Sequence, residues 1–170
     1  AEPGTPIDLC VSAGHRRLRQ NVIKVQREDF DIGREIAALT DGNHAIGGLA
    51  MFVGLVRDLA GDSKISAMTL EHYPGMTEKR LAEIAAEAEA RWPLEGVLII
   101  HRYGRLEPGD RIVLVAATSA HRQAALDACA FLIDWLKTKA PFWKLEEGAA
   151  GAAWVDARES DDHAAEKWRR

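Results

Sequence analysis

The chain has 170 residues, of which 47% are hydrophobic, and its formal net charge is −4. This length and composition suit one globular domain with its own hydrophobic core. The longest apolar runs, residues 97–100 and 112–117, are far shorter than the roughly 20 residues that a membrane helix needs, so no membrane span is predicted. An acidic chain without aromatic residues beside its basic cluster at residues 15–19 is not expected to bind nucleic acid.

Cysteine usage indicates a reducing compartment. Cys10 and Cys129 have neither CxxC spacing nor a histidine cluster beside them, so the sequence predicts no disulfide framework, no metal site and no bound cofactor. Residues 1–22 are predicted to be an irregular tail, and they lack the apolar stretch of a secretory signal. We therefore expect a cytoplasmic protein in which residues 23–170 form a single domain.

The first half of the chain predicts one helix and two strands. Apolar residues recur at helical spacing up to the Asp-Gly-Asn breaker at residues 41–43. Gly47 and Gly48 fall inside the next apolar run and indicate a bulge or a close backbone contact. The predicted elements are a helix at residues 31–39, a buried strand at 45–53, an exposed loop at 54–64 and a strand at 66–73 that ends at Pro74.

Two longer amphipathic helices are predicted in the second half. One covers residues 77–92 and stops at Pro93, and the other covers residues 120–139 and stops before Pro141. The residues expected to face the core from these helices are Leu81, Ile84, Ala85, Ala88, Trp92, Leu126, Cys129, Ala130, Ile133 and Leu136.

A hairpin is predicted between these helices. The sequence LEPGD at residues 106–110 separates two apolar runs, and its Pro-Gly pair suits a type II turn and an antiparallel return. After the second helix we expect a loop rich in Gly and Ala, a short strand near residues 154–157 and a terminal helix with Ser160 as its N-cap. This succession predicts the α+β class.

The segment TSAHR at residues 118–122 joins a predicted strand to a predicted helix. Free backbone N–H groups and the helix dipole favour an anion at such a point. His121 and Arg122 would oppose the dipole, which favours a role in anion binding. The alternative is that Ser119 is an ordinary N-cap and that both basic residues are solvated.

Three lysines surround an aromatic pair where the second long helix ends. Lys137 and Lys139 have an ordinary explanation, because cations are common at helix C-termini. Lys144 lies beyond the helix, beside aromatic residues and other cations, and is a candidate acid–base group. Arg57, in the predicted loop, is either a surface residue or a phosphate ligand.

Other site classes find no support. The sequence contains no GxGxxG or GxxxxGK[ST] loop and no GxSxG nucleophile motif. His44, His72, His101 and His163 do not share a metal-ligand spacing, so we interpret them as structural or surface residues. The residues by themselves thus predict an anion-binding α+β domain with candidate acid–base lysines, and they name no substrate.

Four segments, in this order along the chain, resemble the large, catalytic subunit of molybdopterin synthase. They are LEHYPGM at residues 70–76, TSAHR at 118–122, KTKAPFWK at 137–144 and ARES at 157–160. The resemblance implies an α/β hammerhead fold with an additional, mostly antiparallel sheet. It also implies a sulfurtransferase that converts cyclic pyranopterin monophosphate to molybdopterin during molybdenum cofactor biosynthesis.

The resemblance further implies partners. Members of the family form a homodimer within a heterotetramer, in which each end carries a small ubiquitin-like sulfur-carrier subunit. The carrier's C-terminal Gly-Gly thiocarboxylate enters a pocket of the large subunit and supplies two sulfurs in turn.

Carried over position by position, the resemblance implies that Lys137 and Lys144 are the catalytic pair. Arg57, His121 and Arg122 are expected to hold the phosphate and the carrier's anionic tail. Leu145 stands where most relatives are expected to have a basic residue. The full substrate-binding set implied is Leu55, Val56, Arg57, His121, Arg122, Lys137, Lys144, Leu145, Glu146 and Arg158.

Two alternatives lie outside enzyme catalysis. One is a non-catalytic module that binds phosphate or pterin, and the other is a scaffold for the carrier. Lysines at both 137 and 144 argue against the first, and the joint presence of Arg57, His121 and Arg122 argues against the second.

The spacing within the second long helix predicts a shared site. His121 and Lys137 are 16 positions apart, or about 24 Å along one continuous helix. No Gly or Pro interrupts residues 126–136, so a break is not expected. We therefore expect the basic helix start of one subunit to meet the lysines of another.

Overall fold

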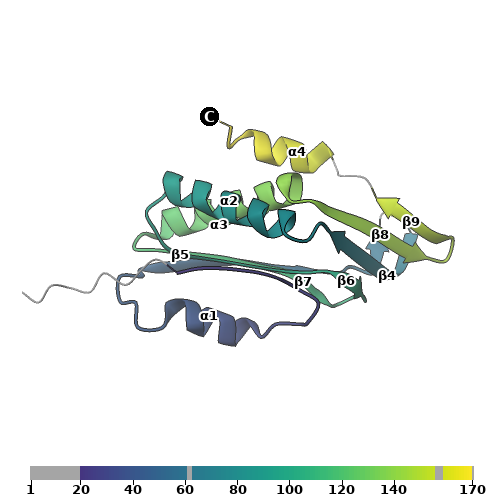
Figure 1. The fold of residues 1–170 in the computed structure, drawn as a ribbon, viewed down its shortest axis with the longest axis horizontal. Coiled ribbons are helices and arrows are strands. Elements are labelled where there is room, and N and C mark those ends of the chain that lie inside the picture. Colours follow the sequence, from purple (N-terminus) through teal and green to yellow (C-terminus); the bar gives the residue numbers. More distant parts are fainter. Residues whose placement is uncertain (1–19, 61–62, 156–158, 170) are drawn as a thin grey trace, which may run out of the picture.

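The computed structural model describes residues 20–60, 63–155 and 159–169. These residues form helices packed on both sides of a central sheet, with a second sheet extending from one end (Figure 1). The described helices are α1 (Ile32–Thr40), α2 (Met76–Arg91), α3 (Arg122–Lys139) and α4 (Glu159–Glu166), and the strands are β1 (Gln20–Gln26), β2 (Gly48–Leu55), β3 (Leu59–Ala60), β4 (Ser63–His72), β5 (Leu94–Arg102), β6 (Gly104–Leu106), β7 (Arg111–Ser119), β8 (Phe142–Gly148) and β9 (Gly151–Val155).

The first sheet has the order β1-β5-β7-β2. Its central strands β5 and β7 are antiparallel, as the predicted hairpin requires, whereas β1 runs parallel to β5. Helix α1 covers one face, and α2 and α3 cover the other (Figure 1). Because both faces are covered, β5 and β7 are apolar along most of their length and lack the alternation of a half-exposed strand.

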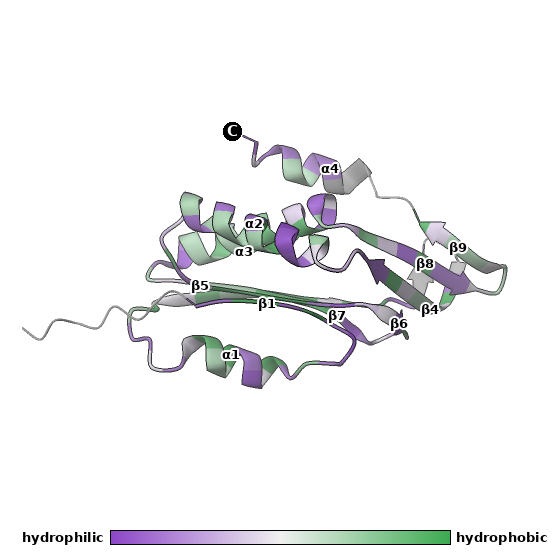
Figure 2. Ribbon diagram, in the orientation of Figure 1, coloured by the Kyte–Doolittle hydropathy of each residue, from purple (hydrophilic) through white to green (hydrophobic). Residues whose placement is uncertain are grey.

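Alternate side chains of β5 divide between two hydrophobic cores. Val97 and Ile99 pack towards α2 and α3, while Leu98 and Ile100 pack towards α1. Hydrophobic residues accordingly run along the first sheet and the helix faces that cover it, whereas β8 mixes hydrophilic and hydrophobic residues (Figure 2).

The second sheet is antiparallel. Its order is β3-β4-β8-β9. Strand β6 also pairs with β4, on the edge opposite β8. A small core links it to the first sheet, formed by Val56 after β2, Met68 and Leu70 of β4, and Leu106 of β6. The second sheet therefore occupies a fixed position at the end of the first.

The C-terminal helix α4 covers the α2 and α3 layer (Figure 1). The following residue Trp168 packs against Trp92 and Phe131, and its indole N–H donates to Asp134 at 2.8 Å. Across the described residues, no helix has the length and apolar character to cross a membrane.

Helix predictions agree closely with the structure, and the α+β class is confirmed. Cys129 lies in the core with 6% exposure, as predicted. Leu126 was expected to be buried, but it is 55% exposed because it points away from the sheet. Gly47 makes the predicted close contact, since a Cβ there would lie 2.2 Å from the Ala120 carbonyl oxygen. The register shift of β2 occurs elsewhere, at Gly54 and Leu55.

Four strand predictions were wrong or incomplete. The expected loop at residues 54–64 contains the end of β2, all of β3 and the start of β4. Strand β8 occupies a region that we expected to be a break and a loop, and β9 begins earlier than predicted. Strand β1 begins at Gln20, inside the segment expected to be irregular. Ser160 was expected to be the N-cap of the terminal helix, and its side chain lies outside the described part of the structure.

Candidate active site

The start of α3 is the first of two basic regions. His121 is the N-cap residue of α3. The alternative in which Ser119 is the N-cap is therefore wrong. The Ser119 hydroxyl instead donates to the Pro93 carbonyl at 2.8 Å and accepts from the His121 backbone N–H at 3.2 Å. The first turn of α3 has no acidic residue, and the side chains of His121 and Arg122 are exposed. This helix start therefore combines backbone N–H groups with two basic side chains.

Two glycines at the start of β2 allow this approach. A Cβ at Gly48 would lie 3.1 Å from the Arg122 Cα, and one at Gly47 would collide with the Ala120 carbonyl. The backbone of β2 thus packs directly against the first residues of α3, which fixes the position of the basic helix start.

The end of α3 is the second basic region. The helix is continuous for 18 residues and carries Lys137 and Lys139 in its last turn. Both side chains are exposed, and the Lys139 ammonium lies 3.5 Å from the centre of the Trp135 ring. Lys139 therefore packs on an aromatic ring of its own helix.

Strand β8 carries the second candidate catalytic lysine. Lys144 pairs with Leu70 and Glu146 with Met68 across the β4–β8 ladder. The Lys144 ammonium lies 2.8 Å from a Glu146 carboxylate oxygen, and the two side chains are 28% and 17% exposed. Because directly opposed residues share a sheet face, this ion pair lies on the face that carries Met68 and Leu70. Leu145, between them, lies on the opposite face.

The segment that follows β2 is anchored to the same face. Val56 is 3% exposed and packs in the small core with Met68 and Leu70. Its N–H donates to the Asp110 carbonyl at 2.9 Å, and its own carbonyl accepts from the Gly109 N–H at 2.8 Å. Leu55 and Arg57, on either side, are exposed. The structure thus places Val56 in the small core with β4, Lys144 and Glu146 on the strand paired with β4, and Lys137 in the last turn of the helix that precedes that strand.

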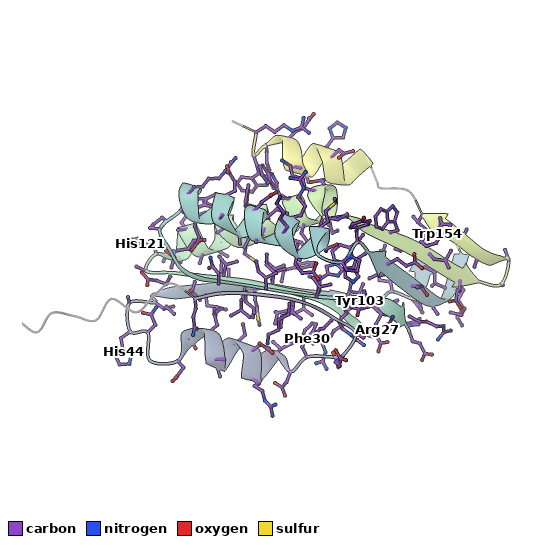
Figure 3. The ribbon with its side chains drawn as sticks, viewed as in Figure 1. Arg27, Phe30, His44, Tyr103, His121 and Trp154 are labelled. Carbon is purple, nitrogen blue, oxygen red and sulfur yellow. The ribbon has the colours of Figure 1, made fainter. Side chains whose placement is uncertain are left out.

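His121 and Arg122 are not part of this group. An 18-residue helix is about 27 Å long, and these two residues lie at its other end. His121 and Trp154, which pairs with Leu145, are at opposite ends of the molecule (Figure 3). Within one chain the basic helix start therefore lies apart from the lysines at the end of α3. Arg158 lies outside the described residues.

Comparison with known proteins identifies the family. Residues 25–139 match the model of the MoaE protein family. The chain belongs to the MoaE family. A molybdopterin synthase catalytic subunit from Pseudomonas aeruginosa is 56% identical, over 86% of this chain and 97% of the relative. The chain accordingly has the catalytic-subunit role, that of a sulfur-transferring enzyme, in molybdenum cofactor biosynthesis.

Solved structures agree on the fold. A MoaE protein from Burkholderia ambifaria has a TM-score of 0.76 and 53% identity, covering 88% of this chain and 98% of its own. A chain from a Helicobacter pylori complex of subunits 1 and 2 of molybdopterin-converting factor has a TM-score of 0.66 at 20% identity, covering 80% and 91%. The hammerhead fold with its additional sheet, expected from the resemblance, is thus the fold of this MoaE family member.

The sequence did not indicate that His101 of this MoaE family member lies beside the segment that follows α3. His101 is 5% exposed and stacks on Phe142, two residues before Lys144. Burial lowers the pKa of His101 from 6.5 to about 4, so its ring is neutral at neutral pH. The apolar run at residues 97–100 indicated that the next residue, His101, is buried. Nothing in the sequence indicated that His101 stacks on Phe142. The described residues hold no group of three metal-ligating side chains.

Proposed function

We propose that this chain transfers two sulfurs to cyclic pyranopterin monophosphate from the thiocarboxylate of a small ubiquitin-like carrier. The placement of Lys137 in the last turn of α3 and of Lys144 on β8, the strand that follows this helix, carries this proposal, together with the exposed Arg57 after β2. The substrate's phosphate and the carrier's terminal thiocarboxylate are both anions, and guanidinium and ammonium groups bind such anions through charge-assisted hydrogen bonds.

The lysines suit the two stages of this chemistry. The thiocarboxylate sulfur first adds to a carbonyl carbon of the pterin side chain, and the carbon–oxygen π electrons move to the oxygen. That oxygen takes up protons and leaves as water as a carbon–carbon double bond forms, so the carrier remains attached through a thioester. Water then attacks the acyl carbon, the carbon–sulfur bond to the carrier breaks, and the sulfur stays on the pterin while the carrier leaves as a carboxylate. An ammonium group stabilises the oxyanion of the tetrahedral intermediate, and a neutral amine accepts the proton of the attacking water. We assign these roles jointly to Lys137 and Lys144, and Glu146 orients Lys144 through their ion pair.

His121 and Arg122 would complete the site from a second copy of the chain. The continuous helix α3 keeps them apart from the lysines of their own chain. At about 100° per residue, Arg122, Leu126 and Lys137 lie within roughly 60° of one another around α3, so one stripe of the helix carries both basic ends. Leu126, at 55% exposure, provides an apolar contact between them.

The neighbouring strand supports the same arrangement. Strand β2 ends its sheet, and its central residues Met51 and Phe52 are 51% and 38% exposed. An unpaired strand edge with exposed apolar side chains favours association with another chain. A two-fold axis through this side of the molecule would place the start of one α3 near the end of the other, giving two equivalent pockets.

The carrier is the second partner. The Helicobacter pylori neighbour was solved as a complex of subunits 1 and 2, which supports a small-subunit partner here. Trp143 and Trp154 are 50% and 57% exposed at the end that holds the lysines, which provides apolar surface for the body of such a carrier. Because its tail is anionic, carrier affinity should fall as salt rises. We place this homodimer-based heterotetramer in the cytoplasm, in agreement with the cysteine usage.

Reconstitution tests this function. The purified chain is mixed with a thiocarboxylated carrier and cyclic pyranopterin monophosphate, and the dithiolene product is assayed. Product is expected with the thiocarboxylate and none with the same carrier ending in a carboxylate, which has no sulfur to donate. Absence of product with every carrier tested, together with retained pterin binding, would favour the non-catalytic binding module.

A further inference from the structure

Four rings meet where the two sheets join, next to the lysine end of α3. His101 is the penultimate residue of β5, His72 is the last residue of β4, Phe142 is the first residue of β8, and Tyr103 lies between β5 and β6. The rings of His101 and Phe142 are stacked with centroids 3.7 Å apart and planes 18° apart. His72 lies 4.4 Å from Tyr103 and 6.2 Å from Phe142. We call these four side chains the ring cluster.

A cationic side chain packs on one ring of the ring cluster. The Arg27 guanidinium lies 4.8 Å from the centre of the Tyr103 ring, and both residues are labelled at this junction (Figure 3). Segments from β1, β4, β5 and β8 therefore meet at one point, and the position of each depends on how the rings pack.

His101 is held in one orientation and one protonation state. Its Nδ1 atom lies 2.8 Å from the Arg102 carbonyl oxygen. Because a carbonyl only accepts hydrogen bonds, Nδ1 carries the hydrogen. Burial, with a smaller effect of the nearby His72, lowers the His101 pKa to about 4, although the hydrogen bond to the Arg102 carbonyl acts in the opposite direction. A neutral imidazole fixed by this hydrogen bond presents a flat face to Phe142.

Phe142 lies at the turn between the two candidate catalytic lysines. After α3 ends, the Phe142 N–H donates to the Ala140 carbonyl at 2.9 Å, which closes a tight turn around Pro141. Phe142 and Lys144 are two positions apart on β8, so their side chains share one face of the second sheet. Movement of Phe142 would therefore move Lys144 relative to Lys137.

The opposite strand supports Phe142 on the same face. His72 pairs with Phe142 in the β4–β8 register, and its Nδ1 atom is buried without a hydrogen-bond partner among the described residues. Leaving such an atom unsatisfied has a free-energy cost, so an apolar side chain would be the more stabilising choice for packing alone. Core stability alone therefore does not explain a histidine at position 72.

We propose that His101 is a positioning residue of the sulfur-transfer site, whose stacked imidazole fixes Phe142 and thereby the position of Lys144 relative to the end of α3. This inference rests on the proposed function of the lysines. His101 does not contact the substrate in this role. It acts through Phe142, and its ring plane is set by the hydrogen bond to the Arg102 carbonyl.

Substitution of His101 tests the role. In the full chain with a saturating carrier, His101→Ala should lower kcat roughly tenfold or more, because a displacement of about 1 Å in a reacting group can cost up to about a hundredfold. The KM for the carrier should change less than about threefold, since Arg57 and Lys137 keep their positions and only Lys144 is displaced. His101→Phe keeps a flat ring and should recover most of kcat. His44→Ala, which changes an exposed histidine before β2, is the matched control.

A second measurement does not depend on turnover. The rate of Lys144 acetylation is followed by mass spectrometry, with the exposed Lys79 of α2 as internal reference. His101→Ala should raise the Lys144 rate severalfold, because the ion pair with Glu146 is no longer held, while Lys79 is unchanged and His101→Phe restores the original rate. If His101→Ala does not fold, Phe142→Leu and Phe142→Tyr make the same comparison, since only tyrosine retains the ring.

Two results would overturn the inference. One is wild-type kcat and wild-type Lys144 reactivity in folded His101→Ala. The other is a folded His101→Phe as impaired as His101→Ala, which would mean that stacking is not what matters. Failure of the proposed function looks different, because the wild-type chain would then form no product while the acetylation pattern still reports on the position of Lys144.

Discussion

The first sheet is enclosed by helices on both faces, whereas the second sheet leaves much of its surface open. In β5, seven of nine residues are buried, with Val97, Ile99 and Ile100 fully buried. In β8, by contrast, each residue is partly or largely exposed, and a lysine and a glutamate face inward. The comparison indicates that stability resides mainly in the first sheet and chemistry mainly in the second sheet and the helix ends.

This division has a physical basis. Burial of one Leu or Phe side chain stabilises a fold by about 1.5–3 kcal/mol, so an enclosed sheet accumulates most of the stabilising free energy. A site that binds anions needs charged groups and access for its ligands, which a fully enclosed sheet cannot supply. Mutations in the two regions should therefore separate loss of stability from loss of activity.

The largest expected effect is on catalysis. Lys137→Ala should reduce sulfur transfer by about 10²–10⁴-fold, the range expected for loss of an acid–base group, while far-UV circular dichroism and dimer mass stay unchanged. Lys139→Ala, two residues away in the same helix turn, is the control and should retain turnover because Lys139 packs on Trp135. Full activity in folded Lys137→Ala would remove this residue from the mechanism.

The next effect is on stability. Leu132→Ala in α3 removes a fully buried side chain from the main core and should lower the free energy of unfolding by about 2–5 kcal/mol. Leu145→Ala on the partly exposed strand β8 should lower it by less than about 1 kcal/mol. Denaturant unfolding measures both changes. Equal losses would contradict the proposed division between the sheets.

A complementation experiment compares the two ends of α3. Arg122→Ala and Lys137→Ala are each expected to be inactive, but mixed dimers would contain one intact pocket. With random exchange of subunits, about a quarter of the wild-type pockets should return, and activity should rise with them. If native mass spectrometry detects the mixed dimers and no activity returns, the pocket lies within one chain.

The smallest effect concerns an ion pair at the surface of the first sheet. Hydrogen bonds from the Arg111 guanidinium lower the pKa of the Asp29 carboxyl from 3.8 to about 2. Because the folded-state pKa is depressed, the stabilisation is present above about pH 4 and is lost as pH falls towards 2. Asp29 is 49% exposed, so Asp29→Asn should lower Tm only slightly at pH 7. A Tm difference that persists at pH 2 would contradict this assignment.

Helices were predictable because their signal is local. Apolar residues recur every three or four positions in α2 and α3, and Pro93 and Pro141 mark where each helix can no longer continue. The close contact at Gly47 was also predictable, since a glycine in an apolar strand has few other structural reasons. The exposure of Leu126 was not, because helix periodicity does not say which side remains uncovered.

Strand β8 escaped prediction for a different reason. Its inward face carries Phe142, Lys144 and Glu146, so hydrophobic alternation is absent even though the strand pairs on both sides. A lysine and a glutamate are tolerated there because each is the ion-pair partner of the other. Sequence patterns deviate from simple rules at positions that serve function, and β8 is such a position.

The sequence by itself determined the helices, the buried runs of β5 and β7, and the basic residues at both ends of α3. The four ordered motifs were also enough to name the family. Tertiary structure alone decided that Val56 packs with Leu106 of β6 and that His101 stacks on Phe142. Those relations join residues dozens of positions apart, and they depend on sheet pairing and packing, which no local pattern of residues specifies.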